Sequence, residues 1–253
     1  MSTTSPVIAG SDISGELARR LSHAAYDRFA TLVEGLSAED WSRPTDCTGW
    51  TVRDMVGHMT GAMRSAASMR EFFGQQIASA LRARRQGCFA VDAMTAIQIE
   101  KTAALTESQI TAECRSLVTR ASDGRARTPQ LLHDKMRFPV EFAGVKETWN
   151  LGYLNDVILT RDAWLHSVDL SRAIGIEPPS DPEVDEAIVA DVVYEWARRH
   201  GAAYRLTLTG SGGGRWGAGD AAPEPITMDA VEFCRALSGR APRDGLLAVD
   251  VPF

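Results

Sequence analysis

Apolar residues recur at helical spacing through most of the first 175 residues. In SGELARRLSHAAYDRFATLVEGL, which starts at Ser14, they lie three or four residues apart, as on one face of an amphipathic helix. Long segments of this kind predict a helical bundle. The other expected elements are a helix from Thr51 to about Met69, one over residues 88–120 with a break near Thr106, a loop over residues 123–142 with two prolines, and a helix from about Lys146 to Ile174.

The break before the second helix carries clear turn and cap residues. SAEDWSRPTDCTGW contains Pro44 and Gly49, which interrupt a helix. Thr51 is a good N-cap, and Asp54 three residues later completes a pattern like a capping box. We therefore expect the second helix to begin directly after Thr51.

The chain changes character after Gly175, where three prolines follow within a few residues. DPEVDEAIVADVVYEWARRHG predicts one more helix. Short alternating segments come next: YRLTLTG as a strand, a glycine-rich turn and a strand near Trp216, PITM before an amphipathic helix, and LLAVDVPF as a strand-like tail. The sequence thus predicts a mainly α protein, with a helical bundle over residues 1–179 and a small α+β domain over residues 180–253.

Composition excludes several classes of protein. The net charge is −6 and no basic block is present, so nucleic acid is not an expected partner. No apolar run reaches the roughly 18 residues of a membrane span, and the N-terminus lacks the pattern of a secretion signal. Four scattered cysteines fit a reduced cytoplasm, where we expect the protein to be a monomer or homodimer without a membrane partner.

His58 stands at the edge of the apolar face of the second helix, beside Met55 and Ala62. On its own, such a histidine is more often a hydrogen-bonded core residue than a metal ligand. Asp162 and His166 change this interpretation because they are four residues apart and share the face that should point into the bundle.

Burying a carboxylate costs several kcal/mol unless it is paired or coordinated. A divalent ion held by His58, Asp162 and His166 would remove that cost and leave an open coordination position, as in catalytic sites. Zinc is the default ion, and iron or nickel would tolerate the same ligands. The alternative is a buried polar pair of Asp162 with His166 or an arginine that only fixes the helix register.

Two further residues lie near these positions in the sequence. Asp169 is one turn beyond His166, so it could orient that histidine or pair with Arg172 at the surface. Cys47 precedes the second helix, and with no base assigned beside it we expect a structural role.

These residues carry a family resemblance. WSRPTDCTGWTVRDMVGHM, from Trp41 to Met59, resembles the signature W-x-x-P-T-x-C-x-G-W-T-V-R-D-x-x-x-H of the mycothiol-dependent maleylpyruvate isomerase family, part of the DinB-like superfamily. RDAWLHSVDLSRAIG resembles its second metal-binding segment. RLTLTGSGGGRW, ITMDAVEFCRALSGRA and VPF resemble, more weakly, the small domain attached to these bundles.

The resemblance implies an up-and-down four-helix bundle that holds a divalent metal through His58, Asp162 and His166. It also implies mycothiol, the low-molecular-weight thiol of actinobacteria, as a cosubstrate. A metal-bound thiol is deprotonated and could add to an electrophilic substrate, giving isomerisation or transfer. Because the family is expected to have glutamate where this chain has Asp162, the resemblance leaves the reaction itself open.

Three residues of the C-terminal region are weaker candidates. Arg240, or Arg235 within the last helix, could bind a substrate carboxylate through two hydrogen bonds, or be a solvated surface arginine. Trp216 could line a cofactor pocket or simply pack. The glycine run before Trp216 lacks the Lys-Ser/Thr ending of a phosphate loop.

Three functions remain compatible with the sequence. The first is a metal-dependent enzyme that acts on small electrophiles with a thiol cosubstrate. The second is an isomerase, cyclase or lyase that uses the metal as a Lewis acid without a thiol. The third is a metal-binding stress protein that is not an enzyme. Fold resemblance cannot choose among them, because function depends on the site.

Overall fold

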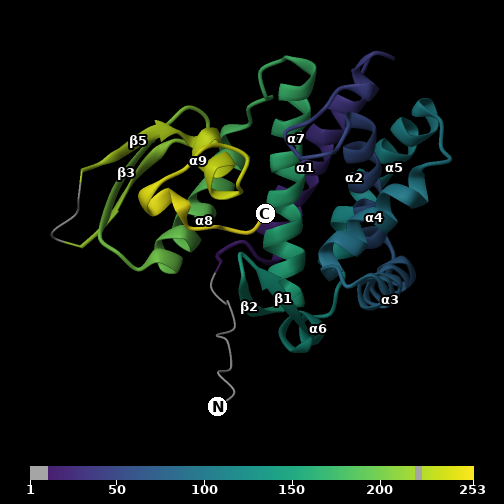
Figure 1. The fold of residues 1–253 in the computed structure, drawn as a ribbon, viewed down its shortest axis with the longest axis horizontal. Coiled ribbons are helices and arrows are strands. Elements are labelled where there is room, and N and C mark those ends of the chain that lie inside the picture. The colour runs from purple at the N-terminus through teal and green to yellow at the C-terminus, as the bar shows by residue number, and fades with distance from the viewer. Residues whose placement is uncertain (1–10, 220–223) are drawn as a thin grey trace. The chain divides into compact units, whose positions relative to one another are not determined.

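A computed structural model describes residues 11–219 and 224–253, which form two compact units. The first unit is Ser14–Pro178, and the second comprises residues 11–13 and Pro179–Phe253. Most of the N-terminal stretch that lacks a secretion-signal pattern lies outside the described residues. Within the described part of the chain, no helix is long and apolar enough to cross a membrane. The predicted mainly helical fold is confirmed, and its strands form small sheets (Figure 1).

The bundle consists of α1 (Gly15–Glu34), α2 (Val52–Ala67), α5 (Glu107–Ala126) and α7 (Leu159–Ile174). Helix α5 packs against α1 and α2, and α7 packs against the same two helices from the other side. The apolar rows predicted from the sequence face inward, including Leu21 and Phe29 of α1 and Met55 and Met59 of α2, all almost fully buried. The bundle core therefore follows from helical periodicity.

The start of α2 is fixed by the expected cap. The Thr51 side chain accepts a hydrogen bond from the Asp54 backbone N–H (3.3 Å), and the Asp54 carboxylate accepts one from the Thr51 N–H (2.9 Å). This capping box stabilises the first turn. Because the helix phase is set at Thr51, the direction of His58 two turns later is set as well.

Two helices flank the bundle beside α2: α3 (Met69–Gln86) and α4 (Ala90–Thr102). The second predicted helix stops at Ser68 and does not run on, because Ser68 has an extended backbone (φ −148°) and caps α3 through Glu71 N–H. The break expected near Thr106 is present, and Thr106 forms a capping box with Gln109 at the start of α5.

The prediction was wrong for residues 130–150. Residues 123–126 still belong to α5, and α6 (Gln130–Lys135) precedes an antiparallel hairpin of β1 (Arg137–Phe142) and β2 (Val145–Asn150), with Pro139 opposite Thr148. The two residues between the strands, Ala143 (φ 50°) and Gly144 (φ 75°), have the left-handed backbone of a tight hairpin turn. Alternation of apolar and polar residues at period two outweighed the helical pattern expected from Lys146 onward.

A π-helix, η2 (Tyr153–Ile158), leads into α7. Its wide turn frees backbone carbonyls, and the buried Arg125 of α5 satisfies that of Asn155. Arg125 also donates to the hydroxyls of Thr160 (2.5 Å) and Tyr26 (3.0 Å). These contacts tie the beginning of α7 to α5 and α1, and so determine which side chains of α7 face the core.

The second unit contains helix α8 (Pro182–His200) and a three-stranded sheet in the order β4-β3-β5. Strand β3 runs antiparallel to β4 and parallel to β5. The chain then forms α9, which packs against α8. The remaining elements are β3 (Tyr204–Thr209), β4 (Gly214–Ala218), β5 (Ile226–Asp229), α9 (Ala230–Leu237) and the 3-10 turn η3 (Gly245–Ala248).

The tail of this unit is not the predicted strand. Residues 245–248 form the turn η3, and Val251 then donates its N–H to the carbonyl of Leu237 (3.1 Å), at the end of a helix. The hydrogen-bond partner of Val251 is thus the end of a helix and not a strand. The alternating apolar residues of LLAVDVPF bury single side chains, such as that of Val251, without forming a sheet.

Gly124 allows α5 to approach α2 closely, and its replacement tests this packing. A Cβ at Gly124 would meet the carbonyl of Ala66 and lie 3.0 Å from the Cα of Ala67, so we expect Gly124→Ala to lower the free energy of unfolding by about 1–3 kcal/mol. Urea denaturation measures this. The control is Gly74→Ala in α3, where a Cβ meets nothing within 4 Å and should stabilise by about 0.5–1 kcal/mol. Equal effects of the two substitutions would contradict the close approach.

Candidate metal centre

His58 of α2 and the pair Asp162 and His166 of α7 converge inside the first unit. The two oxygens of Asp162 face different imidazoles: Oδ2 lies 3.5 Å from His58 Nε2, and Oδ1 lies 3.2 Å from His166 Nε2. The structure therefore brings together the three residues identified from the sequence, although His58 is more than a hundred positions away from the other two.

The donor set fits a divalent ion. Ligands bonded to zinc at about 2.0–2.2 Å in tetrahedral geometry lie about 3.3–3.6 Å from one another. The two distances between Asp162 and the histidines are close to this, and one ligand atom from each of the three residues lies within 4.8 Å of the others. Two neutral imidazoles and a carboxylate would all present lone pairs to the same point, which is unfavourable unless a proton or a cation lies between them. Aspartate is long enough for this, since each of its oxygens already reaches one histidine.

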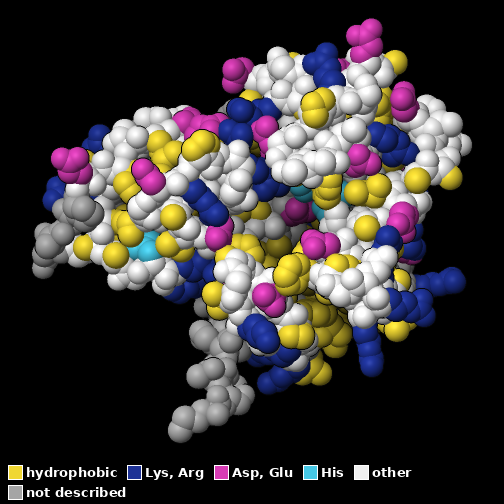
Figure 2. All heavy atoms as spheres, in the orientation of Figure 1, with side chains coloured by type: hydrophobic (Ala, Val, Ile, Leu, Met, Phe, Trp, Pro, Cys, Tyr) yellow, Lys and Arg dark blue, Asp and Glu magenta, His cyan; other side chains and the backbone are white. Residues whose placement is uncertain are grey.

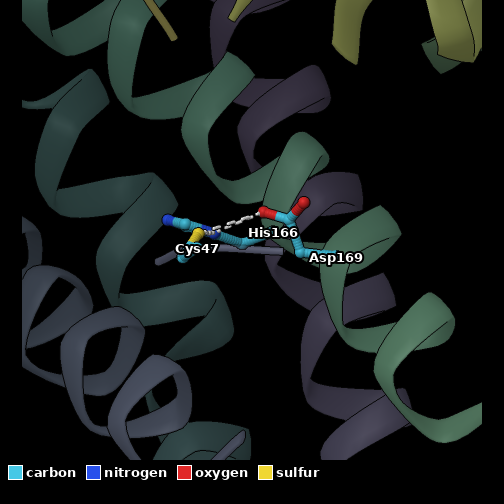
Figure 3. A group of neighbouring side chains, drawn as sticks. All are labelled: Cys47, His166 and Asp169. Carbon is cyan, nitrogen blue, oxygen red and sulfur yellow. Dashed lines mark hydrogen bonds and ion pairs between the residues drawn. The ribbon is translucent and has the colours of Figure 1, made fainter. Parts of the chain in front are cut away.

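Asp169 and Cys47 lie behind His166, on the Nδ1 side of its ring (Figure 3). Asp169 is fully buried, and its Oδ2 is 3.0 Å from His166 Nδ1. Cys47 donates its thiol to the same oxygen (3.6 Å), and its Sγ is 3.9 Å from Nδ1. A carboxylate on Nδ1 keeps the proton there and directs the Nε2 lone pair toward Asp162, as in many metal sites.

The contact of Cys47 with His166 was not predicted from the sequence. For Asp169, two partners were considered, and the structure places it beside His166. Arg172, its other possible partner, pairs instead with Asp46 (Nε–Oδ2 2.8 Å). The segment that contains Cys47 turns back through a bridge between Pro44 and Thr51. Only the tertiary fold brings this thiol to α7, so no local pattern could have identified it.

Cys47, His166 and Asp169 could themselves hold an ion, since their ligand atoms also lie close together. That arrangement uses Nδ1 of His166, and the Nδ1–Oδ2 hydrogen bond already accounts for the shortest contact. The group of His58, Asp162 and His166 uses the Nε2 atoms of two imidazoles and a carboxylate whose side chain is 18% exposed, whereas Asp169 is fully buried, so it is the stronger candidate.

The charges of the site are coupled. Burial would raise the pKa of Asp162, but His166 and His58 more than compensate and hold it well below its usual range. Burial disfavours a charged His166, yet Asp162, Asp169 and Cys47 raise the pKa of His166 well above its ordinary value. Without a metal, these surroundings favour the protonated form of His166, whose ring lies between two carboxylates.

Trp50 forms one wall of the site. Its ring lies 5.2 Å from His58 and 5.9 Å from His166, centroid to centroid, and the two imidazoles are 5.3 Å apart. The side chain of His166 is only 4% exposed, whereas that of Asp162 is 18% exposed. The group is consequently accessible from the Asp162 side, where a ligand from solvent could approach.

The three C-terminal candidates lie in the second unit. Arg235 of α9 is buried, so it is not the solvated surface arginine considered from the sequence as an alternative. Its guanidinium pairs with Glu232 (2.6 Å) and donates to the carbonyl of Arg240 (3.2 Å). Arg240 is half-buried just after α9. Trp216 of β4 is also half-buried, and its ring covers Gly214 of the same strand.

Comparison with known proteins gives a consistent result. Residues 22–171 match the model of a family described as the mycothiol maleylpyruvate isomerase N-terminal domain. Two crystal structures are similar over 89% of this chain and 89% of theirs, at 14% identity: the mycothiol-dependent maleylpyruvate isomerase (TM-score 0.55) and a histidine-to-alanine mutant of it (TM-score 0.54). At this identity the structural likeness shows the fold alone. No curated protein matches the sequence.

Metal binding should compete with protonation of His166. Because Asp162, Asp169 and Cys47 raise the pKa of His166 well above its ordinary value in spite of burial, an incoming ion must displace a proton from this imidazole at pH values where a free histidine is already neutral. The apparent affinity for Zn²⁺ is then expected to rise about tenfold for each pH unit over this range. Competition with a chromophoric chelator measures it, and an affinity independent of pH would contradict the exchange.

Asp169 should strengthen metal binding without touching the ion. We expect Asp169→Asn to weaken the affinity for Zn²⁺ by about 10–100-fold, because a neutral amide holds the Nδ1 proton of His166 less firmly. The matched control is Asp46→Asn, which removes a carboxylate that pairs with Arg172 on the same helix. If both variants bind zinc equally well, Asp169 has no orienting role.

Proposed function

The chain belongs to the mycothiol maleylpyruvate isomerase N-terminal domain family, and from this premise we propose that it is a metal-dependent enzyme acting on a small electrophilic substrate. Its cosubstrate would be mycothiol or a similar low-molecular-weight thiol, and its reaction an isomerisation or a thiol transfer. Zn²⁺ is the proposed ion, because two imidazoles and one carboxylate are typical of catalytic zinc.

One observation carries the proposal: the convergence of His58, Asp162 and His166 on one point that is accessible from the Asp162 side. Structural zinc sites are closed by four protein ligands, whereas catalytic sites have three and an open position. Among the described residues, no fourth histidine, cysteine, aspartate or glutamate belongs to this group. The arrangement thus resembles a catalytic site more than a structural one.

A bound divalent ion would stabilise a thiolate and polarise a substrate carbonyl. The chain itself supplies the surroundings for this chemistry. His58, Asp162 and His166 hold the ion, and Asp169 keeps the Nδ1 proton of His166 in place. The ring of Trp50 lies against both imidazoles and limits the approach of water from that side.

The C-terminal residues keep only proposed roles. Arg240 and Arg235 stay the candidates for binding a substrate carboxylate, and Arg235 is also paired with Glu232 of its own helix. Packing over Gly214 accounts for the position of Trp216, so a pocket-lining role needs separate support. The shorter Asp162, in place of the glutamate expected in the family, leaves open which reaction follows the activation of the thiol.

The deciding experiment measures metal content and turnover together. Purified protein is analysed for bound zinc, and maleylpyruvate is supplied with and without mycothiol. We expect turnover that needs both the metal and the thiol, and that falls by at least about 100-fold in His58→Ala. His23→Ala, a histidine of α1 outside the group, is the matched control and should retain both properties.

The other outcomes separate the rival functions. Zinc-dependent turnover without a thiol would identify a Lewis-acid enzyme instead. Stoichiometric zinc with no turnover of maleylpyruvate or of other reactive electrophiles would favour a metal-binding protein that is not an enzyme. Less than about a tenth of an equivalent of metal, with no gain on reconstitution, would refute the metal centre itself.

A further inference from the structure

Large exposed apolar side chains are concentrated on one short stretch of the first unit. Among the described residues ten such side chains are exposed, and six of them fall between residues 69 and 91. These six, the α3 patch, are Met69 (44% exposed), Phe73 (43%), Ile77 (62%), Leu81 (52%), Phe89 (54%) and Val91 (62%). Four of them lie on α3 and two at the start of α4, and exposed apolar side chains gathered in one part of a protein usually mark a site of interaction.

The apolar row is not a by-product of the core. Met69, Phe73, Ile77 and Leu81 are spaced four residues apart and lie along one face of α3. The buried residues of the same helix are polar: Gln75, which donates to the carbonyl of Gly61 (3.0 Å), and Ser79. Helix α3 therefore turns its polar side inward and its apolar side outward, which a helix that only completes a core does not do.

The charges of α3 differ in sign from those of the whole chain. The helix carries four arginines and one glutamate, a net charge of +3, whereas the chain has −6. Glu71 is paired with Lys101 (2.5 Å) and Arg82 with Glu100 (2.7 Å). The other three arginines, Arg70, Arg84 and Arg85, are exposed and have no ion-pair partner within the described part of the chain.

The exposed apolar row and the exposed arginines together indicate which kind of partner would bind this face. We propose that the α3 patch binds the surface of an anionic lipid bilayer, with the apolar row in the interface and the arginines on the headgroups. Aliphatic and aromatic side chains flanked by arginine are the signature of a helix that lies in a membrane interface. No spanning segment is needed for such a contact, so it departs from the absence of a membrane partner expected from the sequence.

A second copy of the chain fits the patch less well. Pairing α3 with α3 of another molecule, in either direction, would bring the exposed arginines of both copies together. Asp92 is the exposed acidic residue next to the patch in the sequence, and its single negative charge is too small to balance these arginines. An anionic bilayer instead meets Arg70, Arg84 and Arg85, which outnumber Asp92, and charges beyond the Debye length of about 8 Å are screened at physiological salt. Figure 2 shows dark blue and yellow side chains close together on the side of α3.

The test is co-sedimentation of the full chain with lipid vesicles. We expect binding to phosphatidylcholine vesicles that contain about 30% phosphatidylglycerol, and little binding to phosphatidylcholine alone. The double substitution Ile77→Ser and Leu81→Ser should lower the partition coefficient by at least about tenfold. Arg84→Gln and Arg85→Gln should lower it by about fivefold each, and high salt should do the same.

Matched controls keep the result interpretable. Leu131→Ser changes a leucine of α6 that is more exposed (68%) than Ile77 or Leu81, and this variant should bind as the parent protein does. All substituted side chains are exposed, and circular dichroism verifies that each variant is folded. Failure to bind anionic vesicles, or unchanged binding after Ile77→Ser and Leu81→Ser, would overturn the proposal. So would a concentration-dependent dimer that these two substitutions abolish, since the face would then belong to a second copy.

Discussion

The imidazole of His166 lies between two carboxylates of its own helix. Asp162, one turn before it, faces Nε2 (3.2 Å), and Asp169, one turn after it, faces Nδ1 (3.0 Å). Because the residues are four and three positions apart, a regular α-helix is sufficient to build this arrangement. The rest of the bundle has to bring one further donor, His58 of α2, to the Nε2 side of His166. There His58, Asp162 and His166 can share a cation.

That requirement explains the unusual structure just before α7. The π-helix shifts the phase of the chain, and a buried guanidinium, Arg125, fills the widened turn by donating to Asn155 and Thr160. The two terminal nitrogens of this buried guanidinium donate to Tyr26, Asn155 and Thr160, although its Nε has no partner among the described residues, and loss of these bonds would leave further buried donors unsatisfied. Asp162 follows four residues after the π-helix ends, and its direction therefore depends on a contact made by α5.

Much of the fold could be predicted because it rests on local rules. Helical periodicity located the bundle helices, and the cap at Thr51 located the start of α2 to the residue. The hairpin at residues 137–150 was missed: its first strand was predicted as part of a loop with two prolines and its second strand as the start of a helix, and the turn that joins the strands is only two residues long. Cys47 could not be placed beside His166 from the sequence, because their contact spans 119 positions and depends on the whole bundle.

The inner and outer faces of helix α3 are under different constraints: the inner face has to pack closely against α2 and α4, and the outer face has exposed apolar residues. Close packing against α2 and α4 is achieved by amides and small residues: Gln75 bonds to Gly61, and Gln98 donates to Gln75 (3.1 Å). A side chain at Gly61 would collide with Gln98, so this contact tolerates little bulk on its inner face. The inner face is thus specified by hydrogen bonds, which leaves the apolar residues of α3 to the outside. Folding alone would have favoured polar residues at Met69, Phe73, Ile77 and Leu81 as well, so the exposed apolar row indicates a separate, functional constraint on this face.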